Sequence, residues 1–347
     1  MEISTYFKKA IEQKASDLHL VAGSVPATRI GGELVKLSQE ALDTKELEKA
    51  IYALIDVKTK ERFIRKRELD FSQDFFGARF RINLHFQEGK IGLAARMIPI
   101  TIARPEELGF DENIYKLTHL KDGLILVTGP SCSGKSTTLA SMINIINQER
   151  RANIITIEDP IEYLFKEEQS IIEQRELGQD TKSFAQALKY ALRQDPNVIM
   201  VGEMRDIETI SAALTAAETG HLVISTLHTS TAPEAINRIV DVFPSHKQQQ
   251  VLLQLASVLR AVITQQLLPK NGGGLVAARE IMINNAAISN LIRTNQIKQI
   301  YSVIQTSQKE GMITMNKSIE RLLKAGIISE TTAKHSIRNL ETQAIYY

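Results

Sequence analysis

Residues 123–137 read GLILVTGPSCSGKST, an apolar run that passes directly into a glycine-rich loop. Residues 129–136 match the pattern GxxxxGK(S/T), whose backbone N–H groups surround a phosphate while the lysine neutralises it and the hydroxyl ligates Mg²⁺. The run before the loop predicts a buried strand, and the residues after it predict a helix near 135–148. Strand, loop and helix in this order predict an α/β fold with a nucleotide site at the carboxyl end of the strand.

Three more apolar runs follow along the chain, at residues 153–157, 197–202 and 222–227. Helical stretches near 181–194 and 205–218 separate them, which predicts βαβ units and a mostly parallel sheet whose strands are buried on both faces. Residues 247–268 carry leucine or isoleucine at positions 252, 255, 259 and 263, a helical spacing that predicts one more core helix. Residues 271–274 predict a loop. We take residues 121–270 as the core domain and 271–347 as a helical C-terminal region.

The first 98 residues predict a smaller α/β domain. Helices are expected near 3–15 and from about 45 to 65, followed by a hairpin of strands 78–86 and 91–98 around a turn at 87–90. On the first of these strands, Phe80, Ile82, Leu84 and Phe86 share one face, and Arg79, Arg81, Asn83 and His85 share the other. Residues 99–120, with Pro99 and Pro105, predict a linker.

Composition excludes several classes of protein. The 347 residues are 43% hydrophobic with a net charge of +2, which excludes a disordered chain and argues against a nucleic-acid binder, although a local basic patch can be hidden in the total. No run approaches the roughly 18–20 apolar residues of a spanning helix, and no signal peptide begins the chain, so we expect a cytoplasmic protein. The single cysteine, Cys132, excludes an internal disulfide and a paired CxxC zinc site.

The loop and its flanks predict the phosphate-binding residues. They are Gly129, Pro130, Ser131, Cys132, Ser133, Gly134, Lys135, Ser136 and Thr137. Lys135 is expected on the β- and γ-phosphates, and Ser136 on Mg²⁺. Cys132 is either a small tolerated side chain or a redox-sensitive brake on nucleotide binding.

Polar residues that end the other strands predict the rest of the site. Glu203 closes the third strand and is expected to serve Mg²⁺ with Ser136. Glu158, Asp159 and Glu162 follow the second strand, so an acid that orients the attacking water is expected among them. His228 ends the fourth strand as either a γ-phosphate sensor or a structural histidine. His221 begins that strand, at the far edge.

The loop, IEDPIE (157–162), VGEMRD (201–206) and TGHLVISTLHT (219–229) together resemble the secretion and pilus motor ATPases. With ASDLHL (15–20), DFS (70–72) and AISNLIRT (287–294), the chain resembles the PilT family of type IV pilus retraction ATPases over essentially its full length. The resemblance implies a PAS-like N-terminal domain, a RecA-like C-terminal domain, and a ring of six subunits with ATP and Mg²⁺ at the subunit boundaries.

The resemblance also implies roles for single residues. Glu162 would be the water-activating base, Glu203 the Walker B acid, and His221 and His228 the His box. Arg81 and Arg96 are similar in position to arginines that reach a neighbour's ATP, although each would equally serve as a strand-surface arginine in an ion pair. The implied partners are five further copies of the chain and an inner-membrane platform protein at the cytoplasmic face. Neither nucleic-acid binding nor direct membrane insertion is expected.

The sequence departs from the family pattern in two motifs. The loop usually reads GPTGSGKS, so Ser131 and Cys132 are substitutions; the C-terminal motif usually reads AIRNLIRE, so Ser289 and Thr294 each replace a charge. Because that C-terminal motif is associated with retraction and not with hydrolysis, the departure bears on mechanical coupling. Three alternatives stay open: a pilus-extension or type II secretion ATPase, a RecA-like nucleic-acid motor, and a regulatory module that binds nucleotide without hydrolysing it.

Overall fold

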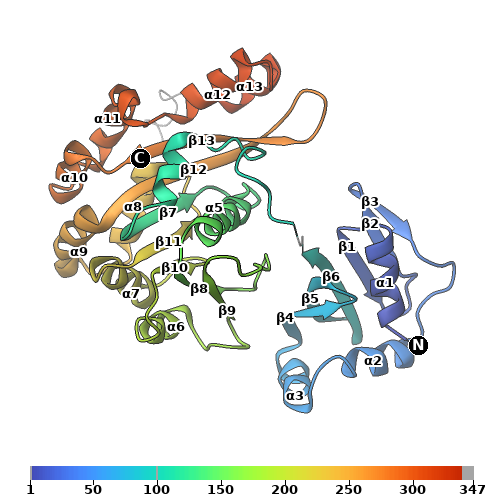
Figure 1. Cartoon of the computed structure of the whole chain (residues 1–347). Helices are drawn as coiled ribbons and strands as arrows, with labels where there is room; N and C mark the ends of the chain where they lie inside the picture. Colours follow the sequence, from blue (N-terminus) through green and yellow to red (C-terminus); the bar gives the residue numbers. More distant parts are fainter. Residues whose placement is uncertain (1, 99–100, 338–347) are drawn as a thin grey trace. The chain divides into compact units, whose positions relative to one another are not determined.

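A computed structural model of the chain describes residues 2–98 and 101–337, which form two compact units (Figure 1). The first comprises residues up to Thr101 together with Pro160–Leu164, and the second comprises the remainder. Both units combine helices with a sheet, so the predicted α/β class is confirmed. Among the described residues, no helix is both long enough and apolar enough to cross a membrane.

The first unit is built on a six-stranded antiparallel sheet in the order β3-β2-β1-β6-β5-β4. The strands are β1 (Asp17–Val21), β2 (Ala27–Ile30), β3 (Glu33–Lys36), β4 (Glu68–Phe75), β5 (Ala78–Gln87) and β6 (Lys90–Ile98), and the helices are α1 (Ser4–Glu12), α2 (Thr44–Tyr52) and α3 (Val57–Lys66). The predicted hairpin is present as β5 and β6. Phe80, Ile82 and Leu84 are fully buried in one cluster with Phe7 of α1 and Phe63 of α3, so the alternation along β5 sets the core face.

The single helix predicted from about 45 to 65 is wrong, because two helices occupy this stretch. α2 ends at Tyr52, and α3 begins at Val57 after the cap residue Asp56, whose carboxylate accepts the Thr59 N–H at 2.8 Å. An aspartate that caps a new helix competes with continuation of the old one. Helix-forming residues on both sides of Asp56 hide this break in a prediction made from spacing alone.

The second unit contains a seven-stranded sheet in the order β13-β12-β7-β11-β10-β8-β9, parallel except for the β12–β13 pair. Its strands are β7 (Gly123–Thr128), β8 (Asn153–Glu158), β9 (Ile171–Glu176), β10 (Val198–Val201), β11 (Leu222–Leu227), β12 (Leu259–Pro269) and β13 (Leu275–Ile283). The four predicted strands are confirmed. Leu124 and Leu126 of β7 belong to one buried cluster, whereas Ile125 and Val127 belong to another, so the sheet is covered on both faces.

Helices cover the two faces of this sheet. α4 (Glu112–Thr118) and α5 (Lys135–Glu149) contribute to one cluster. α6 (Phe184–Ala191), α7 (Ile207–Glu218), α8 (Ala232–Asp241) and α9 (Ser245–Val258) contribute to the other (Figure 1). The helix α4 lies inside the stretch predicted as a linker, because Asp111 caps it and its Ile114 and Leu117 are buried in the core.

The core helix predicted at residues 247–268 is wrong in its second half. α9 ends at Val258, and residues from Leu259 form β12, which lies between β7 and β13. Because a strand buried on both faces is apolar at successive positions, its residues also satisfied a helical spacing. Residues 275–283, predicted as part of a helical region, are β13, which forms a hairpin with β12 through the predicted loop at 271–274.

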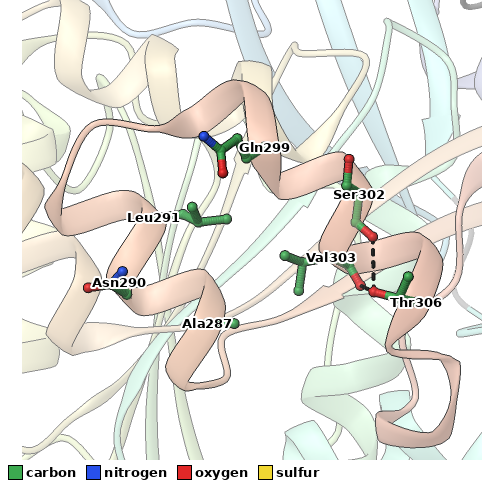
Figure 2. A pocket seen from close by; sticks show the side chains of 7 residues that line it. All are labelled: Ala287, Asn290, Leu291, Gln299, Ser302, Val303 and Thr306. Carbon is green, nitrogen blue, oxygen red and sulfur yellow. Dashed lines mark hydrogen bonds between the residues drawn. The ribbon is translucent and has the colours of Figure 1, made fainter.

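From residue 284 to residue 337 the C-terminal region is helical, and residues 338–347 of the predicted helical region lie outside the described residues. The helices are α10 (Ala286–Arg293), η1 (Ile297–Gln299), α11 (Ile300–Thr306), η2 (Gln308–Glu310), α12 (Met315–Lys324) and α13 (Glu330–Ser336). A groove of about 420 Å³ lies between α10 and α11, with Leu291 and Val303 facing each other across it (Figure 2). Of the two substitutions in the C-terminal motif, Ser289 donates a hydrogen bond to the Ala256 carbonyl of α9, and Thr294 donates one to the Asn290 carbonyl of α10.

Candidate nucleotide site

The glycine-rich loop joins β7 to α5 and is shaped by two glycines. Gly129 has φ +145° and Gly134 has φ +83°, conformations that other residues rarely adopt. A Cβ at Gly129 would also collide with the Gln265 carbonyl of β12 and with the Ser133 hydroxyl. The loop therefore packs directly on the neighbouring strand, with its open side at the N-terminus of α5, where phosphates bind.

Lys135 lies with its ammonium inside this loop. Its Nζ donates hydrogen bonds of 2.8 Å to the carbonyls of Gly129 and Pro130, and the side chain is buried. The cation is thus held inside the loop that would surround a bound phosphate. Cys132, with φ +61°, is exposed on the same loop.

Gln265 supports the loop from β12 and was not predicted from the sequence. Its side chain is 1% exposed; Nε2 donates to the Ser133 carbonyl at 2.7 Å, and Oε1 accepts a hydrogen bond of 2.9 Å from Thr138 of α5. One residue earlier, the hydroxyls of Thr264 and Thr128 are 2.8 Å apart. A buried amide paired at both of its ends fixes the loop to the strand beside it.

Glu203 and His228 lie together at one edge of the sheet. Glu203 follows β10 and His228 follows the neighbouring β11, so both are at the carboxyl edge of the sheet, where the loop follows β7. His228 Nε2 is 3.5 Å from Glu203 Oε2, and the Glu203 side chain is 18% exposed. The exposed Arg205 was not predicted, and its Nε lies 2.7 Å from the same carboxylate oxygen. The residue Arg205 was visible in VGEMRD, but nothing in the pattern showed which way it points.

The acids after β8 fall into two groups. Glu158 is buried at the strand end, where it accepts hydrogen bonds from Thr156 at 2.8 Å and from Gln174 of β9 at 3.3 Å. Glu162 is exposed and belongs to Pro160–Leu164, a segment of the first unit. Glu158 is therefore held within the second unit, to which Asp159 also belongs, whereas Glu162 belongs to the first.

His221 lies at the opposite edge of the sheet from the loop. Its Nδ1 is 2.9 Å from the Ala216 carbonyl and 3.2 Å from the Thr219 hydroxyl, so the ring packs at the end of α7. The six-residue strand β11 separates it from His228, a span of about 20 Å. The fold does not bring His221 to the site of its own chain.

Arg81 and Arg96 are cross-strand neighbours on the exposed face of the first sheet. Arg96 Nε lies 2.9 Å from Asp17 Oδ1, so the ion pair considered from the sequence is present. Burial tends to raise the pKa of Asp17, but hydrogen bonds from Ser16 and Arg96 outweigh it and leave the pKa lowered. Arg96 is nevertheless 72% exposed, which leaves its guanidinium accessible to another molecule.

The oxygen ligands that these residues offer suit Mg²⁺ only when the ion is also bound by phosphate. Across the described residues, no cluster of three or more His, Cys, Asp or Glu side chains is arranged to hold a metal. Ser136 follows Lys135 on α5, and Glu203 supplies a carboxylate at the same sheet edge. Hard oxygen ligands of this kind, few in number, fit an ion that takes most of its shell from phosphates and water.

Comparisons with known proteins agree with the motifs. A family model described as "Type II/IV secretion system protein" matches residues 106–342. The type IV pilus retraction ATPase PilT of Pseudomonas aeruginosa is 44% identical over 339 residues, which cover 97% of this chain and 98% of the relative. A twitching motility protein of Neisseria gonorrhoeae is 45% identical over 93% of this chain and 87% of its own length. A solved structure of the pilus retraction motor PilT with bound ADP has a TM-score of 0.91 at 48% identity, covering 99% of this chain and 98% of that chain.

Proposed function

Because the chain belongs to the Type II/IV secretion system protein family, we propose that it is a motor that hydrolyses ATP to retract a type IV pilus. The observation that carries the proposal is the loop, in which Lys135 is held at the carboxyl end of β7 while Glu203 and His228 end the next two strands along the same edge. The relatives named for pilus retraction and twitching motility support the choice of task, and the neighbour with bound ADP supports the choice of nucleotide.

The roles of the residues follow from their chemistry. Lys135 binds the β- and γ-phosphate oxygens, and Ser136 with Glu203 holds Mg²⁺, which when bound neutralises charge on the phosphates. Glu162 orients the attacking water. His228, next to the Glu203 carboxylate, responds to the γ-phosphate.

Assembly completes the site in this proposal. Six copies form a ring with ATP at their boundaries, where Arg81 and Arg96 serve the neighbouring subunit's nucleotide. A delocalised guanidinium suits the spread negative charge of the transition state. The ring acts at the cytoplasmic face of the inner membrane on a platform protein, through which pilin subunits return to the membrane.

Two measurements test the proposal. Purified protein is expected to release phosphate from ATP with Mg²⁺ present, and a Lys135→Ala variant is the matched control without hydrolysis. A deletion strain is expected to carry excess immobile pili and to lose surface motility, which the wild-type gene restores and the Glu203→Gln gene does not. A strain without pili would instead identify an extension motor, and hydrolysis that requires polynucleotide would identify a nucleic-acid motor.

A further inference from the structure

The helix α3 presents an unusually basic surface on the first unit. Between the cap Asp56 and Arg67 the chain has six basic and two acidic side chains, a net charge of +4, whereas the whole chain has only +2. The rest of the chain therefore has a slightly negative net charge, and this short segment carries a local excess of positive charge. This is a local basic patch of the kind that a balanced total can hide.

One side of α3 packs on the first unit, and charged side chains on the opposite side face solvent. Phe63 is fully buried and stacks on Phe86, Lys60 lies over the Tyr52 ring, and Arg67 lies over Phe86. Lys58, Arg62 and Arg65 recur at helical spacing on the exposed side. Within residues 2–98 and 101–337, none of these three side chains forms an ion pair.

Two exposed apolar side chains lie beside these three basic side chains on α3. Val57 is 76% exposed and Ile64 is 45% exposed. They are seven residues apart, so they lie on the same side of the helix, separated by about 10 Å along its axis. Glu61 lies between the basic and the apolar side chains, and it is the one acidic residue on this side of α3.

We propose that α3 docks the protein on an anionic phospholipid surface, with Val57 and Ile64 entering the headgroup layer and Lys58, Arg62 and Arg65 binding lipid phosphates. An amphipathic helix with a polybasic side is attracted to anionic bilayers, and each basic residue near the surface strengthens binding. This inference deepens the location given in the proposed function. It needs no membrane-spanning segment, because the helix lies on the bilayer.

The side chains favour a lipid over the other polyanions. Single-stranded nucleic acids are held by exposed aromatic side chains on which bases stack, whereas Phe63, the one aromatic residue of α3, is buried. Exposed aliphatic residues such as Val57 and Ile64 add nothing to a phosphate backbone contact, but they gain from a hydrocarbon boundary.

The experiment is co-sedimentation of the full-length protein with vesicles of phosphatidylcholine, with or without phosphatidylglycerol. We expect binding only to the anionic vesicles, weakened by NaCl. Arg62→Gln with Arg65→Gln should weaken it about 25-fold, at about fivefold per charge, and Glu61→Gln should strengthen it about fivefold. The matched control is Lys8→Gln with Lys9→Gln, which removes two exposed charges from α1 of the same unit and should change binding by less than about twofold.

Val57→Ser with Ile64→Ser leaves the charge unchanged and is also expected to weaken vesicle binding. Equal losses in the α1 and α3 charge variants would overturn the proposal. Binding to polynucleotide but not to vesicles would also overturn it. So would a change in the mass of the assembled protein in the α3 charge variant with vesicle binding intact, because that result would identify α3 as an interface between copies. ATP hydrolysis in solution is measured on the same samples, so hydrolysis without vesicle binding refutes only the docking helix, and vesicle binding without hydrolysis refutes only the motor.

Discussion

Replacing Gln265 by leucine removes both of its side-chain hydrogen bonds, one to the nucleotide loop and one to α5. Leucine has nearly the same volume, so little cavity forms. The Ser133 carbonyl and the Thr138 hydroxyl would lose their partner in a region that is almost closed to water. Each unsatisfied buried group costs about 1–3 kcal/mol, so the two together should destabilise the packing of the loop and α5 on β12 by about 2–6 kcal/mol.

The loop's part of that loss should appear as weaker nucleotide binding. If about 2 kcal/mol falls on the conformation of the Ser133 segment, the Kd for ATP rises about 30-fold. Thr138→Val is the comparison, because it breaks only the Gln265 bond to α5 and leaves the bond to the Ser133 carbonyl intact. We expect it to lower the free energy of unfolding with a much smaller change in Kd.

Titration calorimetry gives the Kd of each variant, and urea unfolding gives its stability. Wild-type affinity in a Gln265→Leu protein that is measurably less stable would refute the reasoning, since the bond would then support the fold without shaping the loop. Equal loss of affinity in both variants would show that Thr138, and not the contact with Ser133, transmits the effect.

Three further outcomes are expected. Lys135→Ala should abolish detectable ATP binding in the same titration, because the cation inside the loop is lost. Glu203→Gln and Glu162→Gln should each bind ATP but hydrolyse it about 10²–10³-fold more slowly in a phosphate-release assay, and normal turnover in Glu162→Gln would contradict its assignment as base. Arg96→Gln should raise the pKa of Asp17, because the variant loses a hydrogen bond and a positive charge beside that carboxylate. The lowered pKa of Asp17 contributes stability above the unfolded value of 3.8, and this stability is lost as pH falls through the folded value. In an acid-unfolding profile, the stabilities of the variant and the wild type should therefore differ above pH 4 and converge in stronger acid.

The sequence was sufficient for the central strands and insufficient where a pattern had two meanings. Residues 123–128 and 222–227 were recognisable as strands, since each is a short apolar run with glycine or polar residues at its ends. Residues 259–268 include apolar residues at helical spacing, but their pairing with β7 depends on a partner more than a hundred residues earlier. Local spacing carries no information about that pairing, so the strand was taken for the end of a helix.

The candidate site divides in the same way. The shared edge of Glu203 and His228 was predictable, because parallel strands end at the same edge of a sheet, but the pairing of their two strands was not. Gln265 was not predictable, because its role arises from a buried contact between β12 and the loop that no motif encodes. The direction of the Arg205 side chain and the separate fixing of Glu158 likewise depend on packing around residues far away in the chain.

Two carbonyls of the loop hold the Lys135 ammonium, so this long side chain gives up its rotational freedom when the protein folds. Ordering a lysine costs about 1.5–2 kcal/mol, and that entropy is not lost a second time when a triphosphate arrives. When a phosphate binds, its oxygens replace the two carbonyls as hydrogen-bond acceptors while the ammonium stays in place. An ATPase that binds a new nucleotide in every catalytic cycle therefore avoids this loss of side-chain entropy at each binding step.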